Sequence, residues 1–136
     1  MENHLWKEIY GIGIEEVDSQ HQALLKCLNE CVQETAFPQG VKNDVDMYIL
    51  LNEVNTHADT HFKTEEKLMQ SVNYPDFEMH QHQHRLFKEQ VEQLVRAVSS
   101  GEKPVIAYLA AFLRNWYMRH ILVHDKRIEA YMLCQR

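Results

Sequence analysis

The chain has 136 residues, of which 45% are hydrophobic and 25% are charged, and its formal net charge is −6. These values are typical of one globular domain, taken here as residues 1–136, with a single hydrophobic core. The sequence carries no cluster of lysine and arginine, which disfavours nucleic-acid binding. The longest apolar stretch, residues 105–113, is far shorter than the roughly 20 residues that a membrane-spanning helix requires.

Residues 1–18 are predicted to form an irregular N-terminal arm, because Gly11 and Gly13 interrupt any helical pattern there. The start of the chain has neither the basic residues nor the apolar stretch of a secretory signal, so we expect a cytoplasmic protein. Asp18 or Ser19 is a suitable N-cap for the first helix, which follows the arm.

Apolar residues that recur three or four positions apart predict four helices along the rest of the chain. The predicted helices span residues of about 19–37, 41–72, 76–100 and 104–130. Helix-breaking residues separate them: Pro38 and Gly40, then Asn73 to Asp76, then Ser99 to Gly101. No strand-like alternation competes with this pattern, and the short connections favour antiparallel neighbours. The predicted fold is therefore all-α, an up-down-up-down four-helix bundle.

Histidine is unusually frequent in this chain, with nine residues. Because residues three or four apart share one face of a helix, each histidine can be placed relative to the apolar residues. His61, for example, lies seven residues after Val54 and seven before Leu68, which directs it inward. The histidines on inward faces are His21, His61, His80, His84 and His120, and Glu65 shares the face of His61. Every predicted helix thus directs at least one histidine at the common core.

This combination of buried side chains predicts a metal site. A buried carboxylate is costly unless it is paired or coordinates a metal, and buried imidazoles tend to be neutral and are then poor ion-pair partners. A single histidine on an apolar face is usually an ordinary core residue, but five of them on four facing helices are poorly explained in that way. Metal ions bind neutral imidazoles and ionised carboxylates together. Five histidines and a carboxylate exceed the four ligands of a usual zinc site, so we predict two metal ions bridged by carboxylates.

Four short motifs, in the order and spacing of a known family, contain these residues. Asp18 to His21 is like D-x-Q-H, and His61 to Glu66 is like H-F-x-x-E-E, followed by Met69 and Tyr74-Pro75. His80 and His84 are like H-x-x-x-H and precede Phe87. Trp116, His120-Ile121 and Asp125-Lys126 are like W-x-x-x-H-I-x-x-x-D-K. In these motifs, and over nearly its whole length, the sequence resembles the bacterial hemerythrins.

The resemblance implies a non-haem di-iron centre, without haem, that binds O2 reversibly for transport or storage. On the family's pattern, His80, His84 and His120 ligate one iron. His21 and His61 ligate the other iron, which keeps an open position for O2. Glu65 and Asp125 bridge the two irons, together with a solvent-derived oxygen. O2 takes two electrons from the di-ferrous pair and binds as hydroperoxide, with a proton from the bridging hydroxide.

Asp125 is the one predicted ligand for which the family resemblance and the residue spacing disagree. It lies five residues after His120, about 140° around an ideal α-helix. His124, four residues after His120, is better placed on that geometry. We nevertheless predict Asp125 as the ligand, because two irons need a second anionic bridge and the helix can distort at this point.

The remaining candidates are predicted to have structural roles. His57 shares the stripe of His61 and is expected to support the site or lie at the end of the bundle rather than bind metal. Glu66 points about 100° away from Glu65, so we expect a solvated or interhelical carboxylate. Cys27 and Cys31, four apart on one predicted helix, are expected to be small core residues, with a redox pair or metal site as the alternative.

Trp116 and Tyr117 are predicted to line the O2 pocket. The family usually has a leucine three residues before the histidine of the fourth helix, where it shields the bound O2, and this chain has Tyr117 there. The phenol is larger and carries a hydroxyl that donates and accepts hydrogen bonds. We expect it to speed autoxidation, because a polar pocket admits water and protons. The alternative is a ring that turns aside, with its hydroxyl at the surface of the bundle.

Other functions on the same scaffold are an oxidase, a peroxidase or a nitric-oxide-handling enzyme, and an O2 or redox sensor module. The sequence lacks the Glu-x-x-His motifs of carboxylate-rich di-iron oxygenases, which favours reversible binding over catalysis. Sensor domains usually stand beside output domains in longer chains, so a carrier or store is the primary prediction, with O2 as the partner. The last alternative is a structural bundle with zinc or without metal.

Overall fold

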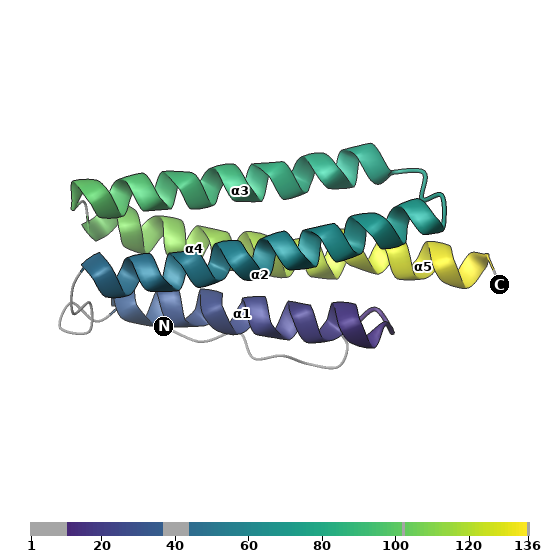
Figure 1. Ribbon diagram of the computed structural model, residues 1–136, viewed down its shortest axis with the longest axis horizontal. Helices are drawn as coiled ribbons and strands as arrows, with labels where there is room; N and C mark the ends of the chain where they lie inside the picture. The colour runs from purple at the N-terminus through teal and green to yellow at the C-terminus, as the bar shows by residue number, and fades with distance from the viewer. Residues whose placement is uncertain (1–10, 37–43, 102, 136) are drawn as a thin grey trace.

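The computed structural model describes residues 11–36, 44–101 and 103–135, and within these ranges it contains helices and turns but no strand. The helices are α1 (Glu15–Ala36), α2 (Asp44–Ser71), α3 (Phe77–Ser100), α4 (Lys103–Arg119), the π-helix η2 (His120–Asp125) and α5 (Lys126–Cys134). Figure 1 shows that α4 and α5 lie along one continuous rod, so α1, α2, α3 and this fourth rod make up the helical part of the described residues. The predicted all-α four-helix bundle is confirmed.

The four rods run alternately in opposite directions, and each contacts two others (Figure 1). α1 packs against α2 and α4, and α3 packs against the same two helices. This is the up-down-up-down arrangement that short connections produce. The turn between α2 and α3 is made by Asn73, at a φ of 54°, and by the N–H of Tyr74, which donates to the carbonyl of Met69 at 2.9 Å.

The prediction of an irregular arm over residues 1–18 is wrong at its end, because α1 begins at Glu15 rather than at about residue 19. Acidic residues in the first turn of α1, Glu15, Glu16 and Asp18, favour an earlier start because they lie at the positive end of the helix dipole. Asp18 lies inside the helix and accepts a hydrogen bond from the N–H of Ile12 at 2.8 Å. Residues 1–10 of the predicted arm lie outside the described residues.

The other helix boundaries differ from the predictions by a few residues. α2 is described from Asp44 onward, and residues 41–43 of its predicted start lie outside the described residues, as do the predicted breakers Pro38 and Gly40. α3 ends as predicted at Ser100, and the φ of 73° at the following Gly101 is the left-handed conformation that glycine adopts without strain. The N–H of Gly101 caps the carbonyls of Ala97 and Val98.

The fourth predicted helix is longer and less regular than expected. It continues beyond residue 130 to Cys134, and η2 interrupts its α-helical hydrogen bonding over the six residues from His120 to Asp125. The residues on either side, Arg119 and Lys126, keep ordinary right-handed helical dihedrals, so the rod changes its winding without breaking. Short π-helical segments of this kind occur frequently at functional sites.

The core of the bundle consists of two hydrophobic clusters. The larger cluster includes Leu24, Val54, Phe87 and Tyr117 and draws residues from all four rods. The smaller cluster consists of Met69, Tyr74 and Ile128, with partly buried residues packed around it. Along α2 and along the fourth rod, a short stretch separates the two clusters, and it contains Glu65 on α2 and Asp125 on the fourth rod. No helix in the described part of the chain is long and apolar enough to cross a membrane.

Candidate metal centre

A layer of buried imidazole and carboxylate side chains lies within the bundle. Each of its seven members is at most 2% exposed: His21, His61, Glu65, His80, His84, His120 and Asp125. Burial of so many titratable groups together is costly unless they compensate one another or bind an ion. These seven residues are the metal ligands that the sequence and the family resemblance predicted, and the fold brings all of them together.

Each helical rod contributes to this layer in a different way. α1 supplies His21, while α2 supplies His61 and Glu65, which are four residues apart and therefore share one face. α3 supplies His80 and His84 at the same spacing. The fourth rod supplies His120 and Asp125 from the two ends of η2. Because π-helical hydrogen bonds join residues five apart, this segment brings the two side chains to the same side of the rod.

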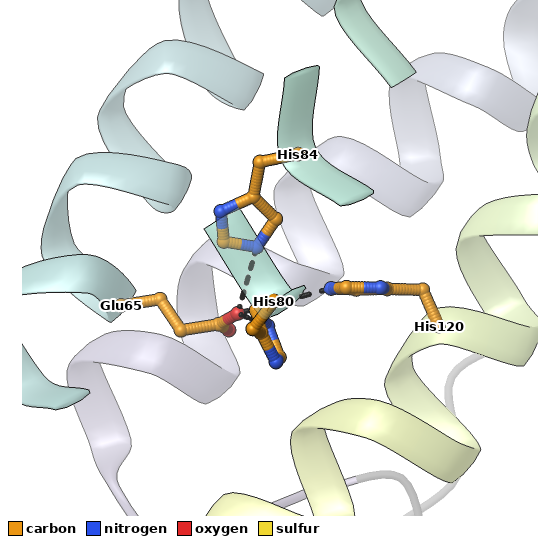
Figure 2. Close-up of side chains that lie close together, drawn as sticks. All are labelled: Glu65, His80, His84 and His120. Atoms are coloured by element: carbon orange, nitrogen blue, oxygen red, sulfur yellow. Dashed lines mark hydrogen bonds and ion pairs between the residues drawn. The ribbon is translucent and has the colours of Figure 1, made fainter. Parts of the chain in front are cut away.

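Three histidines surround one oxygen of Glu65 (Figure 2). Glu65 Oε1 lies 2.6 Å from His80 Nε2, 3.0 Å from His84 Nε2 and 3.9 Å from His120 Nε2. We call these residues the three-histidine group. Their four ligand atoms all lie within 4.8 Å of one another. That separation is close to the spacing of atoms around one ion at metal–ligand distances of about 2.1 Å.

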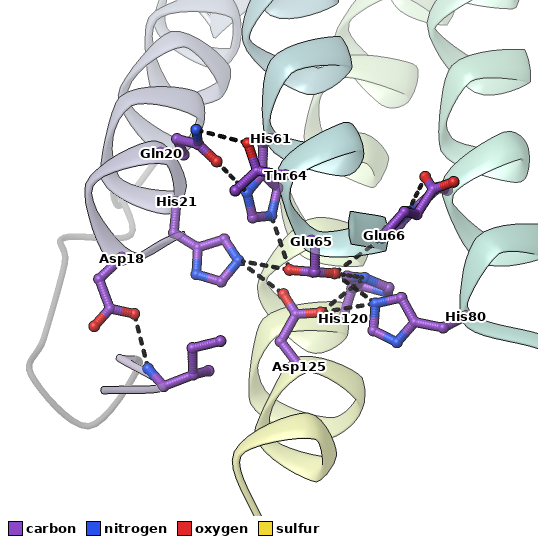
Figure 3. Close-up of polar contacts among 12 residues, drawn as sticks. Asp18, Gln20, His21, His61, Thr64, Glu65, Glu66, His80, His120 and Asp125 are labelled. Atoms are coloured by element: carbon purple, nitrogen blue, oxygen red, sulfur yellow. Dashed lines mark hydrogen bonds and ion pairs between the residues drawn. The ribbon is translucent and has the colours of Figure 1, made fainter. Parts of the chain in front are cut away.

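The other oxygen of Glu65 faces the remaining two histidines (Figure 3). Glu65 Oε2 lies 3.2 Å from His61 Nε2 and 3.5 Å from His21 Nε2. Asp125 completes this two-histidine group, since its Oδ2 lies 2.8 Å from His21 Nε2. The ligand atoms of this second group also lie within 4.8 Å of one another.

Both carboxylates reach from one group to the other. Glu65 presents Oε1 to the three-histidine group and Oε2 to the two-histidine group. Asp125 does the same, because its Oδ1 lies 3.0 Å from His80 and 3.1 Å from His120, while Oδ2 faces His21. Two carboxylates that each give one oxygen to each group have the geometry required to bridge two metal ions.

The hydrogen bonding within the layer is incomplete in a way that fits a metal. The Nε2 atoms of His61 and His120, Glu65 Oε2 and both carboxylate oxygens of Asp125 lie close to other ligand atoms, yet form no hydrogen bond of normal geometry. Buried polar groups are nearly always satisfied, so such a cluster requires an explanation. Lone pairs that converge within each of the two groups explain it, because a metal ion held in each group would accept them.

The electrostatics of the layer show how its charges compensate without metal. Burial alone would lower the pKa of His21 and of His80, but the contacts with Asp125 and Glu65 raise both to about 9. Burial lowers the pKa of His61. Burial would raise the pKa of both carboxyl groups, and for Asp125 the neighbouring Glu65 adds to this, but the surrounding histidines hold both pKa values below their usual range. Metal ions would displace the protons from the histidines and leave the carboxylates ionised.

Three of the candidate ligand histidines are held from outside by residues of neighbouring helices. The sequence predicted no such role for two of these residues, Gln20 and Gln83, and the third, Glu66, takes the interhelical position that was one of the two expected for it. Gln20 Oε1 accepts a hydrogen bond from His61 Nδ1 at 3.3 Å, and Gln83 Oε1 accepts one from His120 Nδ1 at 3.0 Å. Glu66 Oε2 accepts one from His84 Nδ1 at 3.0 Å.

These three residues share a signal that the sequence does contain. Each stands next to a candidate ligand of its own helix: Gln20 before His21, Gln83 before His84, Glu66 after Glu65. An adjacent residue points about 100° around the helix and so faces a neighbouring helix.

The other histidines of the described residues fall outside both groups. His124 is half-buried, and its Nδ1 lies 3.4 Å from Gln83 Nε2, which can donate to it. His57 is half-buried, His82 is exposed, and neither belongs to the two groups of ligand atoms. Cys27 and Cys31 are buried members of the hydrophobic core. His4 lies outside the described residues.

The two predicted pocket residues adjoin different groups of the layer. Trp116 stacks on His120, with ring centroids 5.0 Å apart and planes 8° from parallel, and therefore adjoins the three-histidine group. Tyr117 is fully buried, with ring centroids 6.0 Å from His21 and 6.3 Å from His61, and therefore adjoins the two-histidine group. The alternative in which the Tyr117 hydroxyl reaches the surface is wrong.

A comparison with known families agrees with this arrangement. The sequence model of the Hemerythrin HHE cation binding domain matches residues 12–131, which include all seven buried ligand candidates. The chain belongs to the hemerythrin family. The resemblance predicted from the motifs is thereby confirmed, and the family's description as a cation-binding domain agrees with the buried donor set.

Individual relatives within the hemerythrin family are distant in sequence but similar over most of their length. The chain is 28% identical to a bacteriohemerythrin of Stenotrophomonas maltophilia, over 90% of this chain and 76% of the relative. It is 27% identical to a myohemerythrin of Riftia pachyptila, over 87% of this chain and 84% of the relative. The crystal structure of a leucine-to-tyrosine mutant of a hemerythrin matches with a TM-score of 0.78 and 27% identity, over 93% of this chain and 94% of that one.

Proposed function

We propose that this protein binds O2 reversibly at a non-haem di-iron centre held by the seven buried residues. The observation that carries the proposal is the unequal division of donors between the two groups. With both carboxylates bridging, the three-histidine group offers five protein donors to its ion and the two-histidine group offers four. The ion with fewer protein donors would keep a position open for an external ligand, as O2-binding iron sites require.

When bound, a pair of ferrous ions would supply two electrons to O2 and recover them when O2 leaves. The protein's part is to hold five neutral imidazoles and two ionised carboxylates in a dry interior. Glu65 and Asp125 bring two negative charges, which partly balance the charge of the irons. The bundle side chains above and below the layer keep bulk water out, which protects the ferrous ions from oxidation.

Within this proposal, Tyr117 lines the O2 position and Trp116 does not. Tyr117 adjoins the two-histidine group, and its hydroxyl is buried without a hydrogen-bond partner among the described residues. A phenol there can donate to a bound oxygen species or hold a water molecule beside it. Trp116 stacks on His120 and is proposed to fix the orientation of that ligand.

Reversible binding is proposed rather than oxidase, peroxidase or nitric-oxide chemistry. The support is the ligand set, since five imidazoles and two carboxylates leave the irons more electron-poor than the carboxylate-rich sets of di-iron oxygenases. Two of the relatives bear the names bacteriohemerythrin and myohemerythrin. We propose a carrier or store of O2 as the primary role, with a sensor module as the second, and a cytoplasmic location.

The proposal is tested by metal analysis and visible spectroscopy of the purified protein, expressed with ample iron. We expect two irons per chain, no haem, and a coloured form that appears when air meets the reduced protein and fades when O2 is removed. Zinc or a single iron in place of two would overturn the di-iron assignment. A colour that never reverses when O2 is withdrawn would overturn reversible binding and favour an oxidase.

A further inference from the structure

We propose that Glu66 is a positioning residue that fixes His84 toward the centre of the layer and places an outer negative charge on the three-histidine side. This inference rests on the proposed function and deepens it. It assigns part of the electronic character of the three-histidine side to a residue that contributes no ligand atom to either group.

Glu66 is held between α2 and α3 with both of its carboxylate oxygens engaged. Its Oε2 accepts the hydrogen bond from His84 Nδ1, and its Oε1 accepts one from Gln81 Nε2 at 2.8 Å. Although adjacent to Glu65 in the chain, it points away from the bridging oxygens (Figure 3). Its side chain is 23% exposed, so the charge sits at the edge of the bundle rather than in the dry interior.

The ring of His84 is therefore fixed in two directions. Phe62 stacks on its face, with ring centroids 3.9 Å apart and planes 7° from parallel. Glu66 holds its edge at Nδ1. A hydrogen bond from Nδ1 puts the proton on that nitrogen and leaves the Nε2 lone pair directed at the centre, where Glu65 Oε1 lies 3.0 Å away.

The charge of Glu66 distinguishes His84 from the other two histidines held in the same way. Gln20 and Gln83 are neutral amides, whereas Glu66 is a carboxylate. A carboxylate that accepts from a ligand histidine makes that imidazole a stronger donor. A stronger donor stabilises the more highly charged state of its ion, so Glu66 favours the ferric state on the three-histidine side and lowers its reduction potential.

Two substitutions separate the holding role from the charge. Glu66→Gln keeps an acceptor for His84 Nδ1 and removes the charge, and Glu66→Leu removes both. Glu89→Gln, at an exposed position of α3, is the matched control because it removes one charge away from the site. Metal loss to a chelator is measured for iron-loaded and for Co2+-loaded protein, and the reduction potential is measured for the iron form.

Glu66→Leu is expected to lose either metal about 10- to 100-fold more readily than the parent, as loss of a ligand's outer partner does. Glu66→Gln is expected to retain metal within a few-fold, but to have a higher reduction potential than the parent and Glu89→Gln. Metal retention by Glu66→Leu equal to the parent overturns the holding role, and an unchanged potential in Glu66→Gln overturns the charge role. The measurement with Co2+ tests the holding role even if the parent protein does not take up two irons. Failure of the parent to take up two irons would count against the proposed function and not against the role of Glu66.

Discussion

The side chains of His120 and Asp125 meet in the interior of the bundle, 3.1 Å apart between Nε2 and Oδ1, although the two residues stand five positions apart on one helical rod. An α-helix would place them about 140° apart. The π-helix between them removes this separation and turns Asp125 toward the histidines of α1 and α3. The second carboxylate of the layer therefore depends on a local change of helical winding.

The first prediction separates Asp125 from its neighbour His124. Asp125→Ala is expected to reduce the iron content from two per chain to one or none, because it removes an oxygen from each donor group. His124→Ala is the control and is expected to retain both irons, since its ring stands outside the two groups. Iron analysis of the purified variants decides between them. Loss of iron in His124→Ala, with retention in Asp125→Ala, would reverse the ligand assignment on the fourth rod.

The second prediction concerns Tyr117, whose hydroxyl is buried beside the two-histidine group. Tyr117→Phe is expected to slow autoxidation of the oxygenated protein by roughly fivefold, the factor that a hydrogen bond of about 1 kcal/mol supplies. Tyr117→Leu is expected to slow it at least as much. Stopped-flow O2 dissociation and autoxidation rates are the measurements.

The control for Tyr117 is Tyr131→Phe, which removes an exposed hydroxyl that donates to the carbonyl of Asn73. If both Tyr117 variants match the parent in both rates, Tyr117 serves only for packing. If Tyr117→Phe matches the parent in both rates while Tyr117→Leu differs, the size of the ring matters and its hydroxyl does not.

The third prediction is that the metals stabilise the fold. A metal that binds only the folded state raises the free energy of unfolding by about 4 kcal/mol when its free concentration is 1,000 times its Kd. For a chain of this size, that corresponds to an increase of about 10 °C or more in the melting temperature. Removal of iron with a chelator is therefore expected to lower the melting temperature by that amount, measured by circular dichroism. Equal melting temperatures would mean that the donor layer needs no ion to compensate its charges.

The fourth prediction is that the effect of metal removal depends on pH. In the metal-free protein the pKa values of His21 and His80 are raised from 6.5 to about 9, so their contribution to stability is complete below pH 6.5 and is lost as the pH rises through 9. The pKa values of Glu65 and Asp125 are lowered, so their contribution is present above about pH 4 and is lost as the pH falls.

Metal ions compete with the protons on His21 and His80, so metal affinity rises as the pH approaches 9. The difference in melting temperature between the iron-loaded and metal-free proteins is therefore expected to be larger at pH 9 than at pH 6.5. Thermal melts of both forms at the two pH values measure it. A difference that narrows with rising pH would show that the histidines carry no displaceable protons.

The sequence by itself determined the helical bundle and the inward direction of most candidate ligands. Apolar residues at spacings of three and four fix which face of a helix is buried, and His61, Glu65 and His84 lie on the same stripes as their apolar neighbours. This reasoning needs only the regular geometry of the α-helix, so it holds wherever the helix is regular. For the same reason it placed helix ends only to within a few residues, as at Glu15 and Cys134.

Only the tertiary structure decided what irregular winding and contacts between helices control. Regular spacing favoured His124, and η2 brings Asp125 into the layer instead. The sequence left Glu66 open between a solvated and an interhelical carboxylate, and the packing of α2 on α3 sets it against His84. It also left the direction of the Tyr117 hydroxyl open, and the convergence of four rods buries it. These outcomes depend on which helices are neighbours and at what height, and no periodicity along a single helix contains that information.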